Sequence, residues 1–306
     1  MDRNELKARQ SWTLSQKIDH SLGVIDQFRS RLDGKVYVSF SGGKDSTVLL
    51  DLCRVLDPNI KAVFCNTGNE WPDIVRFVRW MRDAQGANIE IIHPDITPKE
   101  VLARYGFPLI SKETSRIIDA LRNIPNGCLA KRARGEVPHP WRSSQIPQKY
   151  NFLVTETFNT SEKCCYYLKK KPFHQYQRRT GLSPILGVMA SESQLRTSTY
   201  IRRGGCNTFT GKIESMPLAI WTEQDIRDYI KERNLPIADI YGKGAKRTGC
   251  MFCGYGCQNK GDTRFQMLKD LYPKFYEIFM KYENNGVTYK EALGKLLAVN
   301  GLQLPE

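Results

Sequence analysis

Residues 36–46 decide the fold, and they read Val36-Tyr37-Val38-Ser39-Phe40-Ser41-Gly42-Gly43-Lys44-Asp45-Ser46. The first five form an apolar, strand-like run, and residues 47–52 have the pattern of a helix. A glycine pair between a strand and a helix lets the backbone turn sharply and approach a ligand closely. The first turn of the helix presents unpaired N–H groups and a partial positive charge, which favour a phosphate. The stretch therefore predicts a phosphate-binding loop.

The polar side chains of this loop suit a nucleotide that carries a metal ion. Ser41 and Ser46 supply hydroxyl groups for phosphate oxygens, Lys44 supplies a cation, and Asp45 supplies a carboxylate for Mg²⁺. The loop matches neither the P-loop G-x-x-x-x-G-K-[ST] nor the dinucleotide fingerprint G-x-G-x-x-G. An ordinary turn that contains Gly-Gly is the alternative, but six contiguous residues of fitting type favour an adenine nucleotide.

Strand-like and helical patterns alternate after this loop. Apolar strand-like runs occupy 60–65, 89–94 and 184–189, and helical patterns occupy 5–31, 73–84, 98–105 and 222–234. This alternation predicts an α/β fold with a doubly wound parallel sheet of the Rossmann type. Residues 106–180 break the rhythm and are expected to form an insertion. We expect one domain over residues 1–260, with a helical N-terminus, and a helical C-terminal extension over residues 261–306.

Composition and charge bound the functional class. The chain has 306 residues, of which 41% are hydrophobic and 25% are charged, as in globular proteins with a sizeable core. It has no apolar run of about 18 residues and no signal-peptide pattern, so we expect a cytoplasmic protein without membrane helices. The net charge of +14 favours a polyanionic partner such as a nucleic acid, with simple solubility as the alternative.

The nine cysteines favour a metal site over disulfides in a cytosolic chain. Cys250 and Cys253 form a C-x-x-C turn, which lets two thiolates reach one metal centre. The doublet Cys164-Cys165 can complete a four-thiolate site, and this set suits either Zn²⁺ or a [4Fe–4S] cluster. Alternatively, the doublet is incidental and only the C-x-x-C binds zinc.

The loop at 41–46 resembles the PP-loop of the adenine nucleotide α-hydrolase superfamily, whose members bind ATP and commonly cleave it between the α- and β-phosphates. Within that superfamily the chain resembles the phosphoadenosine-phosphosulfate (PAPS) reductase family. The order of Cys164, Cys165, Cys250 and Cys253 is similar to the cluster pattern of four-cysteine members. This resemblance implies a [4Fe–4S] cluster in place of zinc.

Two further segments are similar to family motifs. Residues 64–72 resemble the Asp-Thr-Gly-x-x-(aromatic)-Pro segment, with Asn66 where aspartate is usual, and residues 187–196 resemble the loop Gly-x-Arg-x-x-Glu-Ser-x-x-Arg, with Met189 in place of the first arginine. The second match makes Arg196 a candidate clamp for an anionic group. The residues that the resemblance assigns to nucleotide binding are Ser41, Gly42, Gly43, Lys44, Asp45, Ser46, Thr67, Gly68, Glu192 and Ser193.

The resemblance leaves the reaction open. Sulfonucleotide reductases of this family attack the sulfonate with a cysteine near the C-terminus, and this sequence has no cysteine after Cys257. Related PP-loop enzymes adenylylate an oxygen with ATP, release pyrophosphate and let a sulfur donor displace AMP, in tRNA thiolation or DNA phosphorothioation. We favour such sulfur transfer to a nucleic acid or nucleotide, with Lys44, Asp45 and Arg196 as catalytic residues.

Two alternatives remain. One is an adenylyl-sulfate or PAPS reductase that works with thioredoxin and uses Cys257 or Cys206 as its nucleophile. The other is a non-catalytic nucleotide- or nucleic-acid-binding protein. The favoured reaction implies ATP, Mg²⁺, a sulfur donor such as a cysteine desulfurase, and tRNA or DNA.

A basic stretch in the insertion is a candidate nucleic-acid contact. Its cations alternate with aromatic residues on which bases could stack. The members are Lys131, Arg132, Arg134, Trp141, Arg142 and Tyr150. The alternative is a loop that packs its own tryptophan.

Overall fold

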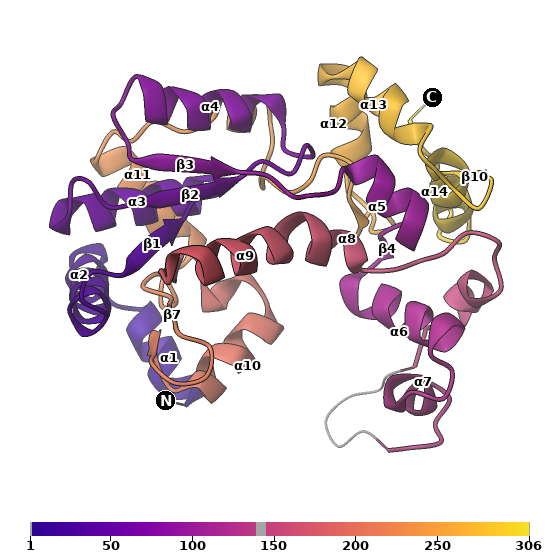
Figure 1. Cartoon of the computed structure of the whole chain (residues 1–306), viewed down its shortest axis with the longest axis horizontal. Coiled ribbons are helices and arrows are strands. Elements are labelled where there is room, and N and C mark those ends of the chain that lie inside the picture. The colour runs from indigo at the N-terminus through magenta and orange to yellow at the C-terminus, as the bar shows by residue number, and fades with distance from the viewer. Residues whose placement is uncertain (1, 139–144, 306) are drawn as a thin grey trace. The chain divides into compact units, whose positions relative to one another are not determined.

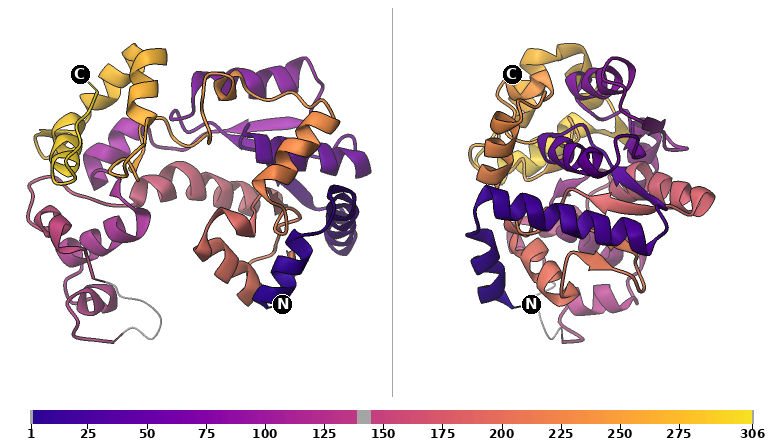
Figure 2. Two further views of the ribbon diagram at one scale, coloured as in Figure 1. Left: turned by 180° about the vertical axis from the view of Figure 1, so that it is seen from behind. Right: turned by 90° about the vertical axis from the view of Figure 1, so that its left-hand side faces the viewer.

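The computed structural model describes residues 2–138 and 145–305, and the chain folds into two compact units. The first unit comprises Met1–Asn66, Trp71–Ile92 and Phe173–Thr248, and the second comprises Thr67–Glu70, His93–Pro172 and Gly249–Glu306. Figure 1 and Figure 2 show these segments by their colour along the chain. The division expected at residue 260 stays a prediction.

A six-stranded sheet forms the centre of the first unit (Figure 1). Its order is β3-β2-β1-β5-β7-β6, and all neighbours are parallel except β6 and β7. The strands are β1 (Val36–Ser39), β2 (Ala62–Cys65), β3 (Ile89–Ile92), β5 (Ser183–Leu186), β6 (Asn207–Thr208) and β7 (Glu214–Ser215). The buried apolar strands β1 and β2 occupy its middle, as expected for a sheet covered on both faces. The predicted doubly wound α/β fold is confirmed.

Helices of the first unit cover the sheet. Figure 1 shows α4 and α9 on opposite sides of the strands, and Tyr176 of α9 packs against Tyr37 and Val63. In the right-hand view of Figure 2, α1 and α2 are the two indigo helices facing the viewer. The helices are α1 (Arg3–Gln10), α2 (Leu14–Arg31), α3 (Lys44–Leu56), α4 (Pro72–Asp83), α9 (Lys171–Thr180, from Phe173 on in this unit), α10 (Gln194–Arg203) and α11 (Glu223–Glu232), with 3-10 turns η3 (Ala190–Glu192) and η4 (Asp239–Tyr241).

The second unit is mainly helical. It has two small sheets, one of parallel β4 (Leu109–Ile110) and β8 (Gly254–Tyr255) and one of antiparallel β9 (Glu283–Asn284) and β10 (Val287–Thr288). Its helices are α5 (Pro98–Tyr105), α6 (Lys112–Asn123), α7 (Cys128–Ala133), α8 (Lys163–Cys165), α12 (Arg264–Leu271), α13 (Pro273–Met280) and α14 (Tyr289–Ala298), with the 3-10 turn η1 (Gln148–Val154) and the π-helical turn η2 (Tyr166–Lys170).

The expectation of continuous helix after residue 261 is wrong at the hairpin of β9 and β10. Asn285 and Gly286 both have positive φ, at 51° and 77°, which is the conformation that a two-residue hairpin turn requires. The Asn-Gly pair was therefore a turn signal in the sequence. Tyr289, which follows the hairpin, is buried and donates a hydrogen bond to the Phe252 carbonyl at 2.8 Å.

Within residues 2–138 and 145–305, no helix is both long and apolar enough to span a bilayer.

Candidate functional site

The glycine loop joins β1 to α3 in the first unit, as predicted. Gly42 has φ of +70°, and a Cβ atom there would lie 2.8 Å from the side chains of Ile74 and Val78 on α4. This position therefore requires glycine on both conformational and steric grounds. Gly43 is the N-cap of α3 and provides no side-chain cap. The helix thus begins at Lys44, three residues earlier than expected.

Two serine hydroxyls fix the shape of the loop. The Ser41 and Ser46 hydroxyl oxygens lie 3.0 Å apart, and Ser46 Oγ also accepts the Ser41 N–H at 3.2 Å. Ser46 in turn donates to the Gly43 carbonyl at 2.9 Å. The structure therefore brings the predicted residues 41–46 together around the first turn of α3, where orphan amides favour an anion.

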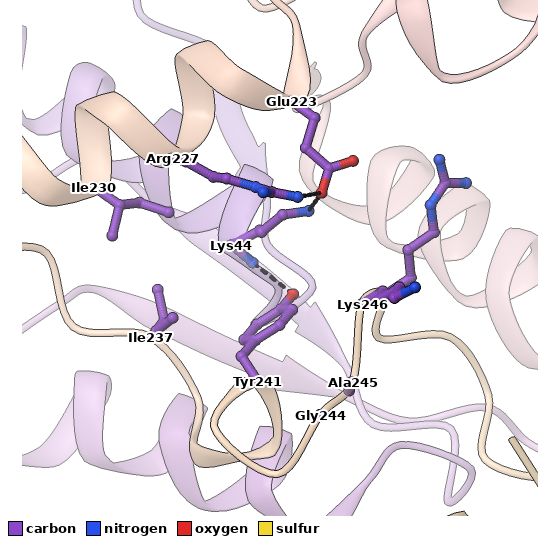
Figure 3. A pocket seen from close by; sticks show the side chains of 10 residues that line it. Lys44, Glu223, Arg227, Ile230, Ile237, Tyr241, Gly244, Ala245 and Lys246 are labelled. Atoms are coloured by element: carbon purple, nitrogen blue, oxygen red, sulfur yellow. Dashed lines mark hydrogen bonds and ion pairs between the residues drawn. The ribbon is translucent and has the colours of Figure 1, made fainter. Parts of the chain in front are cut away.

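Lys44 reaches an ion-pair chain that extends from α11. Its ammonium lies 3.4 Å from Asp45 Oδ1 and 3.8 Å from Glu223 Oε1. Glu223 also accepts a hydrogen bond from Arg227 at 2.9 Å. Figure 3 shows Lys44 and Arg227 converging on the Glu223 carboxylate. The Glu223 carboxylate therefore holds both cations beside the loop. The sequence analysis did not single out Glu223.

Asp45 is mostly buried at the start of α3. Burial raises the pKa of its carboxyl; Lys44 opposes the rise, whereas Glu192 and Glu223 add to it. Apart from the ion pair with Lys44, its Oδ1 atom has no polar partner among the described residues. A largely buried carboxylate whose partner is one lysine ammonium suits a divalent cation, which prefers oxygen ligands.

The loop before α10 holds Glu192, Ser193 and Arg196. Ser193 caps α10 by accepting the Arg196 N–H at 3.2 Å, and Glu192 accepts the Arg196 guanidinium at 2.6 Å. Glu192 therefore lies between Arg196 and Asp45, with which it interacts electrostatically. The arginine predicted as an anion clamp is paired with a carboxylate in this structure.

A cavity of about 620 Å³ opens beside Lys44 within the first unit (Figure 3). Tyr241 forms one wall, and its hydroxyl accepts the Lys44 N–H at 2.9 Å and lies 3.2 Å from the Thr248 hydroxyl. Other lining residues are Glu223, Arg227, Ile230, Ile237, Gly244, Ala245, Lys246 and Arg247. Sequence reasoning missed Tyr241, because nothing in a lone tyrosine nearly 200 positions away indicates that it lies on the loop.

Thr67 and Gly68 belong to the second unit. The Thr67 N–H and hydroxyl both donate to the Glu70 carboxylate, at 2.8 and 2.7 Å. Gly68 has φ of +80° and faces Pro98 at the start of α5. This turn is therefore a closed hydrogen-bonded unit, and the assignment of Thr67 and Gly68 to nucleotide binding stays a prediction.

The four predicted ligand cysteines gather in the second unit. Cys164 and Cys165 lie in the short helix α8, and Cys250 and Cys253 flank a turn closed by the Cys253 N–H and the Cys250 carbonyl at 3.2 Å. Each thiol is close enough to others of the set to shift their pKa values. Among the described residues, no three His, Cys, Asp or Glu side chains are placed to hold one metal ion.

The pKa values of the four cysteine thiols are shifted in different directions. A hydrogen bond with Cys164 lowers the pKa of Cys165 to about 6, with help from the ammonium groups of Lys112 and Lys169, and raises that of Cys164. Burial raises the pKa of Cys250, and it raises that of Cys253 to about 12. The environment therefore favours a thiolate at Cys165.

Lys169 is a half-buried cation beside the four cysteines that the sequence analysis missed. It hydrogen-bonds to Cys250, and the charges of Cys250, Glu70 and Cys165 raise its pKa. It lies on the π-helical turn η2, which follows the Cys164-Cys165 doublet directly. Such widened turns often mark functional sites because they shift the side-chain register of a helix.

Cys206 and Cys257, the candidate nucleophiles of a reductase, are both buried. Cys206, in the first unit, lies 3.3 Å from the Tyr200 hydroxyl, and burial raises its pKa. Cys257, in the second, is buried as well, and burial raises its pKa to about 12. Both groups are thus protonated thiols at neutral pH.

The predicted basic contact is described only in part. Trp141 and Arg142 lie outside the described residues. Arg134 pairs with Glu136, and the buried Tyr150 hydroxyl donates to Asn300 at 3.1 Å. Tyr150 therefore packs within the unit, and the nucleic-acid contact of this stretch stays a prediction.

Comparison with known families matches residues 35–126 and 111–255 to the family described as the phosphoadenosine phosphosulfate reductase domain. The chain belongs to this family. The family supports adenine nucleotide binding by this chain. The assignment of residues 41–46 to that nucleotide stays a prediction.

Individual relatives of this PAPS reductase-family chain are distant. The adenosine 5'-phosphosulfate reductase of Staphylococcus haemolyticus is 24% identical over 244 residues, which cover 78% of this chain and 77% of that protein. Two uncharacterized proteins of Methanocaldococcus jannaschii are 23% and 25% identical over 84% and 87% of this chain. The chain covers 50% and 44% of those two proteins, so it spans about half of their length.

Two solved structures are also similar. The PAPS reductase of Candida auris, in a phosphate complex, has a TM-score of 0.45 and 13% identity, covering 82% of this chain and 96% of that one. An FMN adenylyltransferase of Candida glabrata, bound to FMN and an ATP analogue, has a TM-score of 0.44 and 12% identity, covering 81% and 70%.

Proposed function

We propose that this PAPS reductase-family protein is an ATP-dependent enzyme of sulfur transfer that adenylylates an oxygen of a nucleic acid or nucleotide. The observation that carries the proposal is the start of α3. There, first-turn amides and the ion pair of Lys44 with Asp45 meet, and Lys44 also lines the cavity. These groups supply the donors and the metal ligand that a nucleotide phosphate chain needs.

Each residue has a role that follows from its position. The amides at residues 42–46 and the two serine hydroxyls would hold the phosphates, once the Lys44 amide has left the Tyr241 hydroxyl and the Gly43 amide has left Ser41. Lys44 would neutralise the charge that develops on the leaving pyrophosphate, and such preorganised charges stabilise transition states without reorganisation. Asp45 would hold Mg²⁺, which supplies Lewis-acid stabilisation of that charge. Arg196 would leave its ion pair with Glu192 and bind an anionic group of the substrate.

We assign a [4Fe–4S] cluster to Cys164, Cys165, Cys250 and Cys253. The four thiols interact with one another, and Lys169 and Lys112 offset the charge of thiolates there. In such a cluster each thiolate binds a different iron, so the four sulfurs need not converge on one point. A bound cluster would position the substrate or accept an exogenous sulfide. Such a reduced thiol set fits a cytosolic protein.

A sulfonucleotide reductase is the second candidate, favoured by the Staphylococcus relative named as such. It would need a thiolate to attack the sulfonate sulfur. Cys206 and Cys257 are buried and their pKa values are raised, so neither presents a thiolate. For this reason we rank sulfur transfer first.

One experiment separates the candidates. The protein is purified without oxygen, its iron and visible spectrum are measured, and ATP, adenylyl sulfate and PAPS are offered with thioredoxin, RNA or DNA. Iron together with pyrophosphate release from ATP supports the proposal. Thioredoxin-dependent sulfite release identifies a reductase, and turnover of none of the three nucleotides supports a non-catalytic binding protein.

A further inference from the structure

Three tyrosines form an aromatic surface next to the cysteine doublet, within the second unit. The rings of Tyr105 and Tyr167 are stacked, with centroids 4.6 Å apart and planes 12° apart. The Tyr166 ring meets Tyr167 edge-on at 5.2 Å. Tyr105 ends α5, and the other two begin the π-helical turn immediately after Cys165. Helices α5 and α8 pack together and lie side by side in Figure 1.

Cations surround this tyrosine surface. The Arg104 guanidinium lies 5.3 Å and the Lys163 ammonium 5.6 Å from the centre of the Tyr105 ring. Within this unit, residues 163–172 contain four lysines and no aspartate or glutamate. Two of these lysines have carboxylate partners, since Lys163 pairs with Asp119 at 3.4 Å and Lys171 with Asp95 at 3.0 Å. Lys169 interacts with Cys250 and Glu70, and the exposed Lys170 leaves a positive charge on the turn that carries Tyr166 and Tyr167.

One of the three rings is available to a ligand. The Tyr105–Tyr167 stack also joins α5 to the cysteine helix, so helix packing explains that pair. Tyr166 is 46% exposed, and helix packing does not require an exposed ring there. An exposed aromatic face among lysines is the arrangement that binds unpaired bases and their phosphates, and every base can stack on such a ring.

We propose that this tyrosine surface binds a single-stranded nucleic acid, with a base stacked on Tyr166 and phosphates near Lys170 and Arg104. This placement brings the strand to the helix that holds Cys164 and Cys165. The inference deepens the proposed function, on which it rests for the role of the strand as acceptor, and it names single-stranded RNA or DNA as the substrate class. The binding itself requires no catalysis.

The test measures binding of the full chain to fluorescein-labelled strands of about 12 nucleotides, within the site sizes typical of such proteins. Single-stranded RNA, single-stranded DNA and a duplex are compared by anisotropy at several salt concentrations, without ATP. The variants are Tyr166→Leu, which removes the ring, and Lys170→Gln. Phe275→Leu is the matched control, because Phe275 is 40% exposed on α13 of the same unit.

Tyr166→Leu is expected to weaken single-strand binding about tenfold, as the loss of one stacked base implies. Lys170→Gln is expected to weaken binding and to flatten its salt dependence, since one phosphate contact is lost. The comparison of RNA with DNA identifies the preferred strand. Circular dichroism of each variant confirms the fold.

The proposal is overturned if the wild-type chain binds no single strand at low salt, or if Tyr166→Leu binds as tightly as Phe275→Leu. Equal affinity for duplex and single strand in every variant also overturns it, because stacking would then play no part. Pyrophosphate release from ATP is measured separately on the same samples. A chain that turns over ATP but binds no strand refutes this inference and leaves the adenylylation proposal standing.

Discussion

Asp45 illustrates at the residue scale how a functional side chain opposes stability. Its folded-state pKa is raised by burial, so the folded protein binds a proton there more tightly than the unfolded chain does. The free energy of unfolding therefore falls as pH rises from the ordinary carboxyl range through the raised value. This loss of stability is the cost expected of the metal-binding role that we propose for Asp45.

Asp45→Asn is expected to increase the free energy of unfolding at pH 7 by about 1 kcal/mol while it removes nucleotide turnover. The neutral amide avoids the burial of a charge. The gain should shrink as pH falls toward the ordinary carboxyl pKa, where aspartate is protonated in both states. Urea unfolding at several pH values measures it, and a variant that is less stable at pH 7 would contradict this account of Asp45.

Lys44→Ala is expected to reduce turnover at least about a hundredfold, since preorganised charges at the transition state contribute that much. The visible spectrum should not change, because Lys44 and the four cysteines belong to different units. Lys35→Ala, which removes an exposed lysine just before β1, serves as the control. Full activity in Lys44→Ala would remove this lysine from the mechanism.

At the element scale, the sequence predicted a strand-to-helix turn at the glycine pair, although α3 begins three residues earlier than expected. It also predicted a C-x-x-C turn, whose metal binding stays a prediction. These signals are local, because the glycine conformation and the spacing of the two cysteines depend only on neighbouring residues. Thr222 caps α11 in a capping box with Asp225, and its N–H donates to the Asp225 carboxylate at 2.6 Å. The hairpin at Asn285-Gly286 was missed because helical periodicity was extended across a turn signal.

The contacts that complete each site were not predictable in the same way. Tyr241 meets the Lys44 amide, and Lys169 meets Cys250, only after segments far apart in sequence have packed. Neither residue belongs to a spacing pattern. A π-helical turn also has no simple sequence signature, although it sets which side chains of residues 166–170 face the cysteines.

The C-x-x-C turn carries its own prediction. Cys253→Ala should abolish the brown chromophore of the purified protein and its iron content, because one of four proposed ligands is lost. Cys128→Ala is the control, since Cys128 is exposed in α7 and outside the proposed ligand set. Wild-type absorbance in the Cys253 variant would show that the ligand set is wrong.

At the scale of the whole molecule, we expect the two units to respond differently to the loss of iron. All four proposed ligands lie in the second unit, in segments brought together by the fold. Metal binding of this kind contributes directly to folding free energy. Removal of iron by a chelator is therefore expected to increase amide hydrogen exchange in residues 160–172 and 249–258, with little change in β1, β2 and α3.

Mass spectrometry of exchanged peptides measures this response. The peptides of the first unit serve as the internal control in the same sample. Equal loss of protection in both units would contradict the assignment of iron to the four cysteines alone.

The order of strands in the sheet has a consequence for the chain while it is being synthesised. The central strand β1 pairs on one side with β5, where Val36 lies opposite Ser183, and the first unit also needs segments that end only at Thr248. Until β5 leaves the ribosome, one edge of β1 has no neighbour, and an open apolar edge invites pairing with other chains. Newly made chains therefore depend on protection from aggregation for most of translation, and fragments ending before β5 should be insoluble.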